Sequence, residues 1–264
     1  MNYFGLISGF PNLKPRQNLN LEVTDLKAML SQYLTEEDQK IATLFFYQID
    51  LINFNSIIQN KSLWLDGGNL NQENLTKWIK TGILEDSPFT ANTNDNLNQK
   101  PNQTEALQAH WQKYYEVLLM QSNPTLTRFI TYEITLKNFF KSYLERFAKV
   151  ESGQHYIDGG KFDRFAYNKL LMGDIQAEYP FLAAALSSFD VKNAFDRETK
   201  LLDAKWKYYD YVSFFDAFSF MGVYAWLCKY LDLLKWQLNN KELGKENLEA
   251  FSKKITQQTE EYYQ

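Results

Sequence analysis

The segment from Asn193 to Asn240 constrains the fold more than any other part of the sequence. It contains no proline, and Gly222 is its only glycine. Between Tyr208 and Leu234 apolar residues occupy nearly every side of a helical wheel, as is typical of a helix at the centre of a bundle. The segment therefore predicts one very long helix, or two helices in near-continuity.

Helical periodicity and breaks recur along the rest of the chain. Thr35 followed by Asp38 is close to a capping box, and the apolar residues of 41–58 recur at steps of three and four. Only Tyr3 to Ser8 can pass for a short extended segment. The other predicted helices are one that Thr24 caps, Gln72–Thr81, one from Thr104, Thr125–Val150, Phe162–Met172, Phe181–Phe189 and a last one after Gly244. The predicted fold class is all-α, with successive helical bundles joined by long helices.

A polar stretch over residues 86–104 divides this pattern. It holds two prolines and, between Asn92 and Gln103, seven Asn or Gln residues. Such a composition predicts a surface loop or a mobile linker. We therefore expect a single all-helical chain over 1–264, with 1–85 and 105–264 as two candidate sub-bundles.

Charge and cysteine usage narrow the setting. The 28 Lys and Arg residues against 32 Asp and Glu leave a formal charge of −4, whereas nucleic-acid binders usually carry a basic excess. Cys228 is the single cysteine, flanked by apolar residues, and we expect it to be a buried core residue. The opening Met1 to Pro11 lacks a secretory signal pattern. These features favour a cytoplasmic protein that does not bind nucleic acid.

The most hydrophobic stretch runs from Phe214 to Leu234. Three charged residues interrupt it, and charges at bilayer depth are costly; we therefore expect a core helix rather than a membrane span. We predict that Asp216, within this stretch, is a buried carboxylate. A structural hydrogen bond to a tyrosine hydroxyl is favoured there over a functional proton site.

Aromatic residues make up 16% of the chain, which favours wide aromatic contacts between helices or with partners. Packing between helices is the simpler explanation for most of them. In the helix predicted over 125–150 the aromatic residues recur on one side, which predicts a core stripe. Its members are Phe129, Tyr132, Leu136, Phe140, Tyr143 and Phe147.

The sequence contains none of the common catalytic, metal-binding or phosphate-binding motifs. Neither His110 nor His155 has a glutamate three residues earlier, as the arms of di-iron bundles require. There is no HExxH motif or cysteine pair for zinc, and the Gly-Gly-Lys at 159–161 lacks the features of a phosphate-binding loop. Asp196, Asp203 and Asp210 fall at seven-residue steps, which indicates a solvated stripe or a partner-facing edge. We predict no catalytic, cofactor-binding or metal site, and no enzyme.

Two segments resemble a known family. Tyr3 to Leu13 (YFGLISGFPNL) resembles the opening of a bacterial family of unknown biochemical function whose genes occur within operons for V-type ATP synthases. Phe218 to Asp232 is similar to that family's late apolar helix. Members usually have an acidic residue and an arginine there, where this chain has Gly222 and Lys235-Trp236.

That family is similar, more distantly, to the C (or d) subunit of V-type rotary ATPases. The resemblance implies a subunit-C-like helical fold and a non-catalytic central-stalk role, coupling the shaft of the soluble head to the membrane rotor ring. The implied partners are rotor-ring and central-shaft subunits, with no small-molecule substrate. The implied location is the inner face of the cell membrane, reached through protein partners. The alternative from a different class is a helical adaptor or assembly factor unrelated to rotation.

Overall fold

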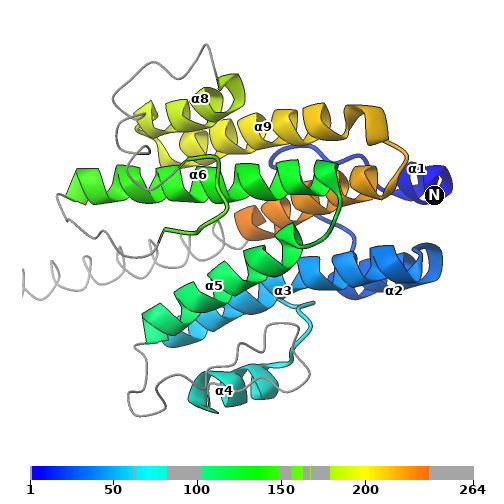
Figure 1. Cartoon of the computed structure of the whole chain (residues 1–264), viewed down its shortest axis with the longest axis horizontal. Helices are drawn as coiled ribbons and strands as arrows, with labels where there is room; N and C mark the ends of the chain where they lie inside the picture. Colours follow the sequence, from blue (N-terminus) through cyan, green and yellow to red (C-terminus); the bar gives the residue numbers. More distant parts are fainter. Residues whose placement is uncertain are drawn as a thin grey trace, which may run out of the picture.

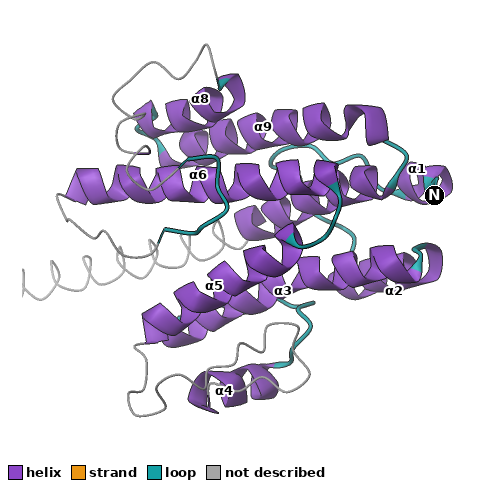
Figure 2. Ribbon diagram, viewed as in Figure 1, coloured by secondary structure: helices purple, strands orange, loops and turns teal. Residues whose placement is uncertain are grey.

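The computed structural model describes residues 2–61, 63–81, 103–148, 156–162, 167 and 179–237. All regular elements in these ranges are helical (Figures 1 and 2), which confirms the predicted all-α class. They are α1 (Phe4–Gly9), α2 (Val23–Tyr33), α3 (Glu36–Ile58), α4 (Gln72–Thr81), α5 (Gln103–Leu119), α6 (Pro124–Ala148), α8 (Pro180–Leu186), the 3₁₀ turn η1 (Ser187–Asp190), α9 (Ala194–Ser213), the 3₁₀ turn η2 (Phe214–Asp216) and a helix over residues 220–237.

The long apolar segment forms two helices that fold back on each other, not one continuous helix. α9 ends at Ser213, η2 follows, and the helix over 220–237 runs antiparallel to α9. The reversal is tight: the Ala217 carbonyl approaches Gly222 so closely that a Cβ at this position would lie 2.0 Å from the carbonyl oxygen. Ser219 begins the second helix, since its hydroxyl accepts a hydrogen bond from the Met221 N–H at 3.0 Å. The expectation of near-continuity is therefore wrong.

The start of α3 confirms the predicted capping pattern. The Thr35 hydroxyl accepts a hydrogen bond from the Asp38 N–H at 3.3 Å, which satisfies one of the unpaired donors of the first turn. Thr24, in contrast, is not a cap. α2 begins at Val23, and Glu22 is the flanking residue, without a side-chain cap.

The N-terminal segment corrects a second expectation, because residues 4–9 form the short helix α1 instead of an extended segment. Tertiary contacts hold it there. The Tyr3 N–H donates to the Phe218 carbonyl at 2.7 Å, and the Tyr3 hydroxyl donates to the Asp38 carboxylate at 2.5 Å. Further along, the Phe10 ring stacks on Trp226 with centroids 4.2 Å apart. Residues 2–13 therefore lie against the last described helix.

Most buried side chains belong to one large apolar core. It takes residues from α1 to α6, from the C-terminal half of α9 and from the helix over 220–237, so both candidate sub-bundles contribute to it. A smaller cluster lies between α6, α8 and α9. The aromatic stripe of α6 is confirmed for Phe129, Tyr132 and Leu136, which are buried; Phe140 and Tyr143 are half-buried.

Several predicted features lie almost wholly outside the described residues. They are the polar loop over 86–104, the helix over 162–172, His155 and the helix after Gly244. The helices predicted over 72–81 and 181–189 are confirmed as α4 and as α8 followed by η1.

Candidate docking surface

The aromatic end of the molecule carries five large side chains that the fold leaves in water. It consists of Phe4 (57% exposed), Tyr211 (64%), Phe214 (69%), Phe215 (96%) and Phe218 (48%). Tyr211 lies in the last turn of α9, three more lie in the reversal between α9 and the last helix, and α1 supplies Phe4. In Figure 1 this reversal and α1 lie at the same end of the long axis.

Ring contacts join four members of the aromatic end in two pairs, while the Tyr211 ring contacts Phe181 of α8 with centroids 4.9 Å apart. The Phe4 and Phe218 centroids are 5.1 Å apart, as are those of Phe214 and Phe215. A side chain as exposed as Phe215 touches little of its own chain, so a partner can enclose it on several sides. Large exposed apolar patches on a folded surface indicate interaction sites.

The turn that presents these rings is held firmly. The Thr125 hydroxyl, in the first turn of α6, donates to the Asp216 carboxylate at 2.9 Å. The Asp216 carbonyl in turn accepts from the Ser219 hydroxyl at 2.8 Å. Asp216 is half-buried and bonded to a threonine, so the predicted buried carboxylate with a tyrosine partner is wrong. Its structural role, bonding the turn to α6, is what the geometry supports.

The buried carboxylate of this region is Asp232 instead. It is 5% exposed and accepts a hydrogen bond from Lys205 of α9. Cys228, one turn earlier, is 3% exposed, and burial raises the pKa of its thiol. The predicted buried core cysteine is confirmed.

The three regularly spaced aspartates lie on the exposed face of α9. Asp210 pairs with Lys229 at 2.5 Å, and Asp196 lies 3.9 Å from the Arg16 guanidinium. The exposed face of α9 therefore also forms ion pairs with the segment around Arg16 and with the last helix.

His110 is half-buried and packs against aromatic residues of the core. Its ring centroid lies 4.3 Å from that of Trp78 and 5.5 Å from that of Phe54. Burial lowers the pKa of His110 to about 4, so the imidazole is neutral at pH 7. Within the described part of the chain, no three His, Cys, Asp or Glu residues form a group that could hold a metal ion.

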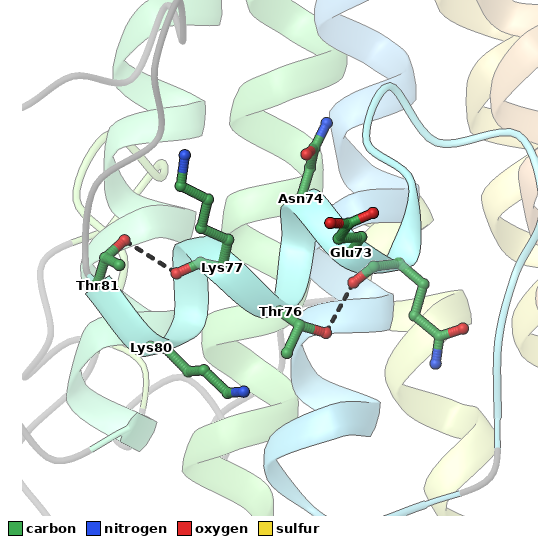
Figure 3. A pocket seen from close by; sticks show the side chains of 7 residues that line it. Glu73, Asn74, Thr76, Lys77, Lys80 and Thr81 are labelled. Atoms are coloured by element: carbon green, nitrogen blue, oxygen red, sulfur yellow. Dashed lines mark hydrogen bonds between the residues drawn. The ribbon is translucent and has the colours of Figure 1, made fainter.

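A polar groove of about 800 Å³ runs along α4. Figure 3 shows that its lining side chains all come from this one helix, and that Lys77 and Lys80 point in different directions. Two of them bond to the helix itself: the Thr76 and Thr81 hydroxyls donate to backbone carbonyls four residues earlier. No second described element brings a functional group toward this groove.

The sequence predicts aromatic anchors in general but not which aromatic residues are exposed. Phe214, Phe215 and Phe218 lie in the most apolar stretch of the chain, where core positions are expected. A local signal does exist, since the Ser219 N-cap and Gly222 mark a chain reversal. With the reversal placed, the preceding phenylalanines fall on a turn.

Comparison with known proteins identifies a family and nothing beyond it. A family model described as "Protein of unknown function (DUF2764)" matches residues 1–259. No curated protein and no solved structure matches the chain. Among the described helices, α3 is long and apolar enough to cross a membrane, and 67% of its most apolar window is buried inside the fold.

Proposed function

The chain belongs to the DUF2764 family of proteins of unknown function, and we propose that it is a non-catalytic coupling subunit that docks on protein partners through the aromatic end. The observation that carries the proposal is a set of five exposed aromatic side chains on and beside a hydrogen-bonded turn. From their exposed fractions, they offer roughly 500–800 Å² of aromatic surface. A standard protein interface buries about 800 Å² on each partner.

The rigidity of the turn supports docking rather than adaptive wrapping. A turn whose backbone is already ordered loses less conformational entropy when it binds. Aromatic residues are enriched in interface cores. The aromatic end has both properties.

The partners in this proposal are the rotor-ring and central-shaft subunits of a V-type ATP synthase. The support is the sequence resemblance, together with the way its two segments meet. Tyr3 to Leu13 and Phe218 to Asp232 are more than 200 residues apart, yet they contact each other: the Trp226 indole donates to the Pro11 carbonyl at 3.0 Å. The two resembling segments therefore form one structural unit, which supports treating them as a joint signature. The protein would act at the inner face of the membrane, held there by these partners.

A comparative pull-down from membranes of the native host tests this function. The tagged parent protein is expected to recover ring and shaft subunits at comparable stoichiometry. The double variant Phe214→Ser/Phe215→Ser should lose them, because truncating a central anchor typically costs at least about 2 kcal/mol of binding. The matched control is Leu144→Ser, which removes another exposed apolar side chain (60% exposed) near the other end of α6.

Recovery of the parent protein alone, from membranes with an intact ATPase, would rule out the coupling role. Recovery of other proteins in its place, lost in the double variant, would favour the adaptor or assembly factor. Equal losses in the double variant and in Leu144→Ser would remove the aromatic end from either function.

A further inference from the structure

The interior between α6, α9 and the last helix contains buried oxygen atoms that no other described group satisfies. They are the hydroxyls of Tyr209 and Tyr224 and the carboxylate atoms Oε2 of Glu133 and Oδ2 of Asp232, and none has a hydrogen-bond partner among the described residues. We name these four residues the polar centre. Both tyrosines are 0% exposed. Buried polar groups in native proteins are nearly always hydrogen-bonded, so four such atoms in one region require an explanation.

Ring contacts place Glu133 beside both tyrosines. Glu133 lies one turn after Phe129 on the same side of α6. The Phe129 ring contacts Tyr209 of α9 with centroids 5.7 Å apart and Tyr224 of the last helix with centroids 5.4 Å apart. The side of α6 that carries Phe129 and Glu133 therefore faces both arms of the hairpin.

The hairpin brings the second carboxylate to the same region. Lys205 of α9 donates to the Oδ1 atom of Asp232, which leaves Oδ2 without a partner among the described residues. The Lys205 amine also lies 5.8 Å from the ring centroid of Tyr209, so Asp232 and Tyr209 contact the same lysine. Asp232 follows Tyr224 by eight residues, about two helical turns, and therefore shares a side of the last helix with it.

The unsatisfied atoms are complementary in their hydrogen bonding. Burial raises the pKa of Tyr209 and of Tyr224 well above its ordinary value, so both hydroxyls keep a proton to donate. The Glu133 carboxylate adds to this rise in pKa at both tyrosines, in agreement with its position beside them. Ionised carboxylate oxygens only accept. A water molecule accepts and donates, and it bridges polar groups that do not bond directly.

We propose that the polar centre is a binding site for ordered water, which accepts hydrogen bonds from the tyrosine hydroxyls and donates to the carboxylate oxygens. A buried water typically makes about three hydrogen bonds, and the polar centre supplies four atoms for them. The bound water joins α6 to both arms of the hairpin. The bond between Thr125 and Asp216 makes the same connection at the turn. This site is independent of any docking partner.

Oxygen-17 magnetic relaxation dispersion of the folded full-length chain tests the site, because it counts water molecules that exchange more slowly than the protein tumbles. The double variant Tyr209→Phe/Tyr224→Phe keeps both rings and removes two of the four partners. We expect it to hold at least about one long-lived water fewer than the parent. The matched control is Tyr230→Phe on the last helix, since the Tyr230 hydroxyl already donates to the Leu21 carbonyl at 2.6 Å. Equal counts in the parent and the double variant would overturn the proposal.

The sign of the change in stability gives a second test. If water satisfies the hydroxyls, Tyr209→Phe and Tyr224→Phe each lose hydrogen bonds, and each urea midpoint should fall below the parent's. Hydroxyls buried without any partner are unfavourable, so their removal would instead raise the midpoint. Tyr230→Phe should lower it and gives the size of the shift for a direct bond. A midpoint at or above the parent's in both Tyr209→Phe and Tyr224→Phe would contradict bound water.

Discussion

The aromatic end and the pair that Lys205 forms with Asp232 are opposite exceptions to the usual distribution of side chains. At the aromatic end apolar rings remain in water, although Phe215 could gain from burial. In the Lys205–Asp232 pair a charged group leaves water, since Asp232 is 5% exposed. The first exception costs the isolated fold little, because exposed apolar residues are normal on protein surfaces. The second is costly unless each charge is paired, so the two regions should respond differently to substitution.

The largest effect should separate aromatic residues of the interior from those of the aromatic end. Phe129, on α6, is fully buried, and Phe129→Ala should lower the free energy of unfolding by about 3–5 kcal/mol through lost burial and the cavity left behind. Phe215→Ala should change it by no more than about 0.5 kcal/mol. Urea denaturation of both variants gives the comparison. A loss above about 2 kcal/mol for Phe215→Ala would show that its ring supports the fold.

The next effect concerns the ion pair between Lys205 and Asp232. Asp232→Asn leaves Lys205 as a buried cation without its carboxylate, and removing one member of a buried pair costs about 3–5 kcal/mol. Asp210→Asn is a matched control, because Asp210 pairs with Lys229 across the same two helices but is itself exposed. An exposed pair contributes about 0–1 kcal/mol. Equal losses of unfolding free energy for the two variants would mean that burial does not distinguish the pairs.

Asp50 and His110 should give smaller effects on the free energy of unfolding, which depend on pH with opposite signs. Burial raises the pKa of Asp50 from 3.8 to about 6, so its contribution to stability is present below pH 3.8 and is lost as pH rises through 6. Burial lowers the pKa of His110 from 6.5 to about 4, so its contribution is present above pH 6.5 and is lost as pH falls through 4. Each shift corresponds to at most about 3 kcal/mol.

The two slopes oppose each other between pH 4 and 6, and single variants should reveal them. Relative to the parent, the unfolding free energy of Asp50→Asn should rise with pH over this range, while that of His110→Gln should fall. Urea denaturation at pH 4, 5 and 6 measures both. A difference from the parent that does not vary with pH, for either variant, would contradict the corresponding shift.

The smallest effect on stability is expected for the pair of substitutions that matters most for binding. Phe214→Ser/Phe215→Ser should leave the unfolding free energy within about 0.5 kcal/mol of the parent's for each residue, because both rings are exposed. Binding of an apolar dye by the native protein should decrease. A marked loss of stability would make its pull-down result uninformative about docking and would place the rings in the core of the fold.

Local sequence signals predict much of the helical pattern but not the reversal after α9. Thr35 caps α3 as predicted because a cap depends on only a few neighbouring residues. The turn at 214–219 depends on Thr125, which lies 91 residues from its partner Asp216. A bond at such separation leaves no periodic trace in the sequence.

The aromatic end is formed by that turn, so the sequence does not predict it either. Phe214 and Phe215 have the composition of a core helix, and their exposure arises only because the chain reverses there. The burial of Asp232 against Lys205 depends on the same reversal, because the reversal brings the last helix back along α9. Tertiary contacts therefore determine both the exposure of the rings and the burial of the Asp232 carboxylate.

Site-specific photo-crosslinking from the aromatic end tests the central claim most directly. Phe215 is replaced by a photoreactive benzoylphenylalanine in cells of the native host, with the same replacement at Leu144 as the control. The docking account predicts that position 215 crosslinks to a rotor-ring or central-shaft subunit and that position 144 does not. Crosslinks from position 144 to those subunits, with none from position 215, would contradict it.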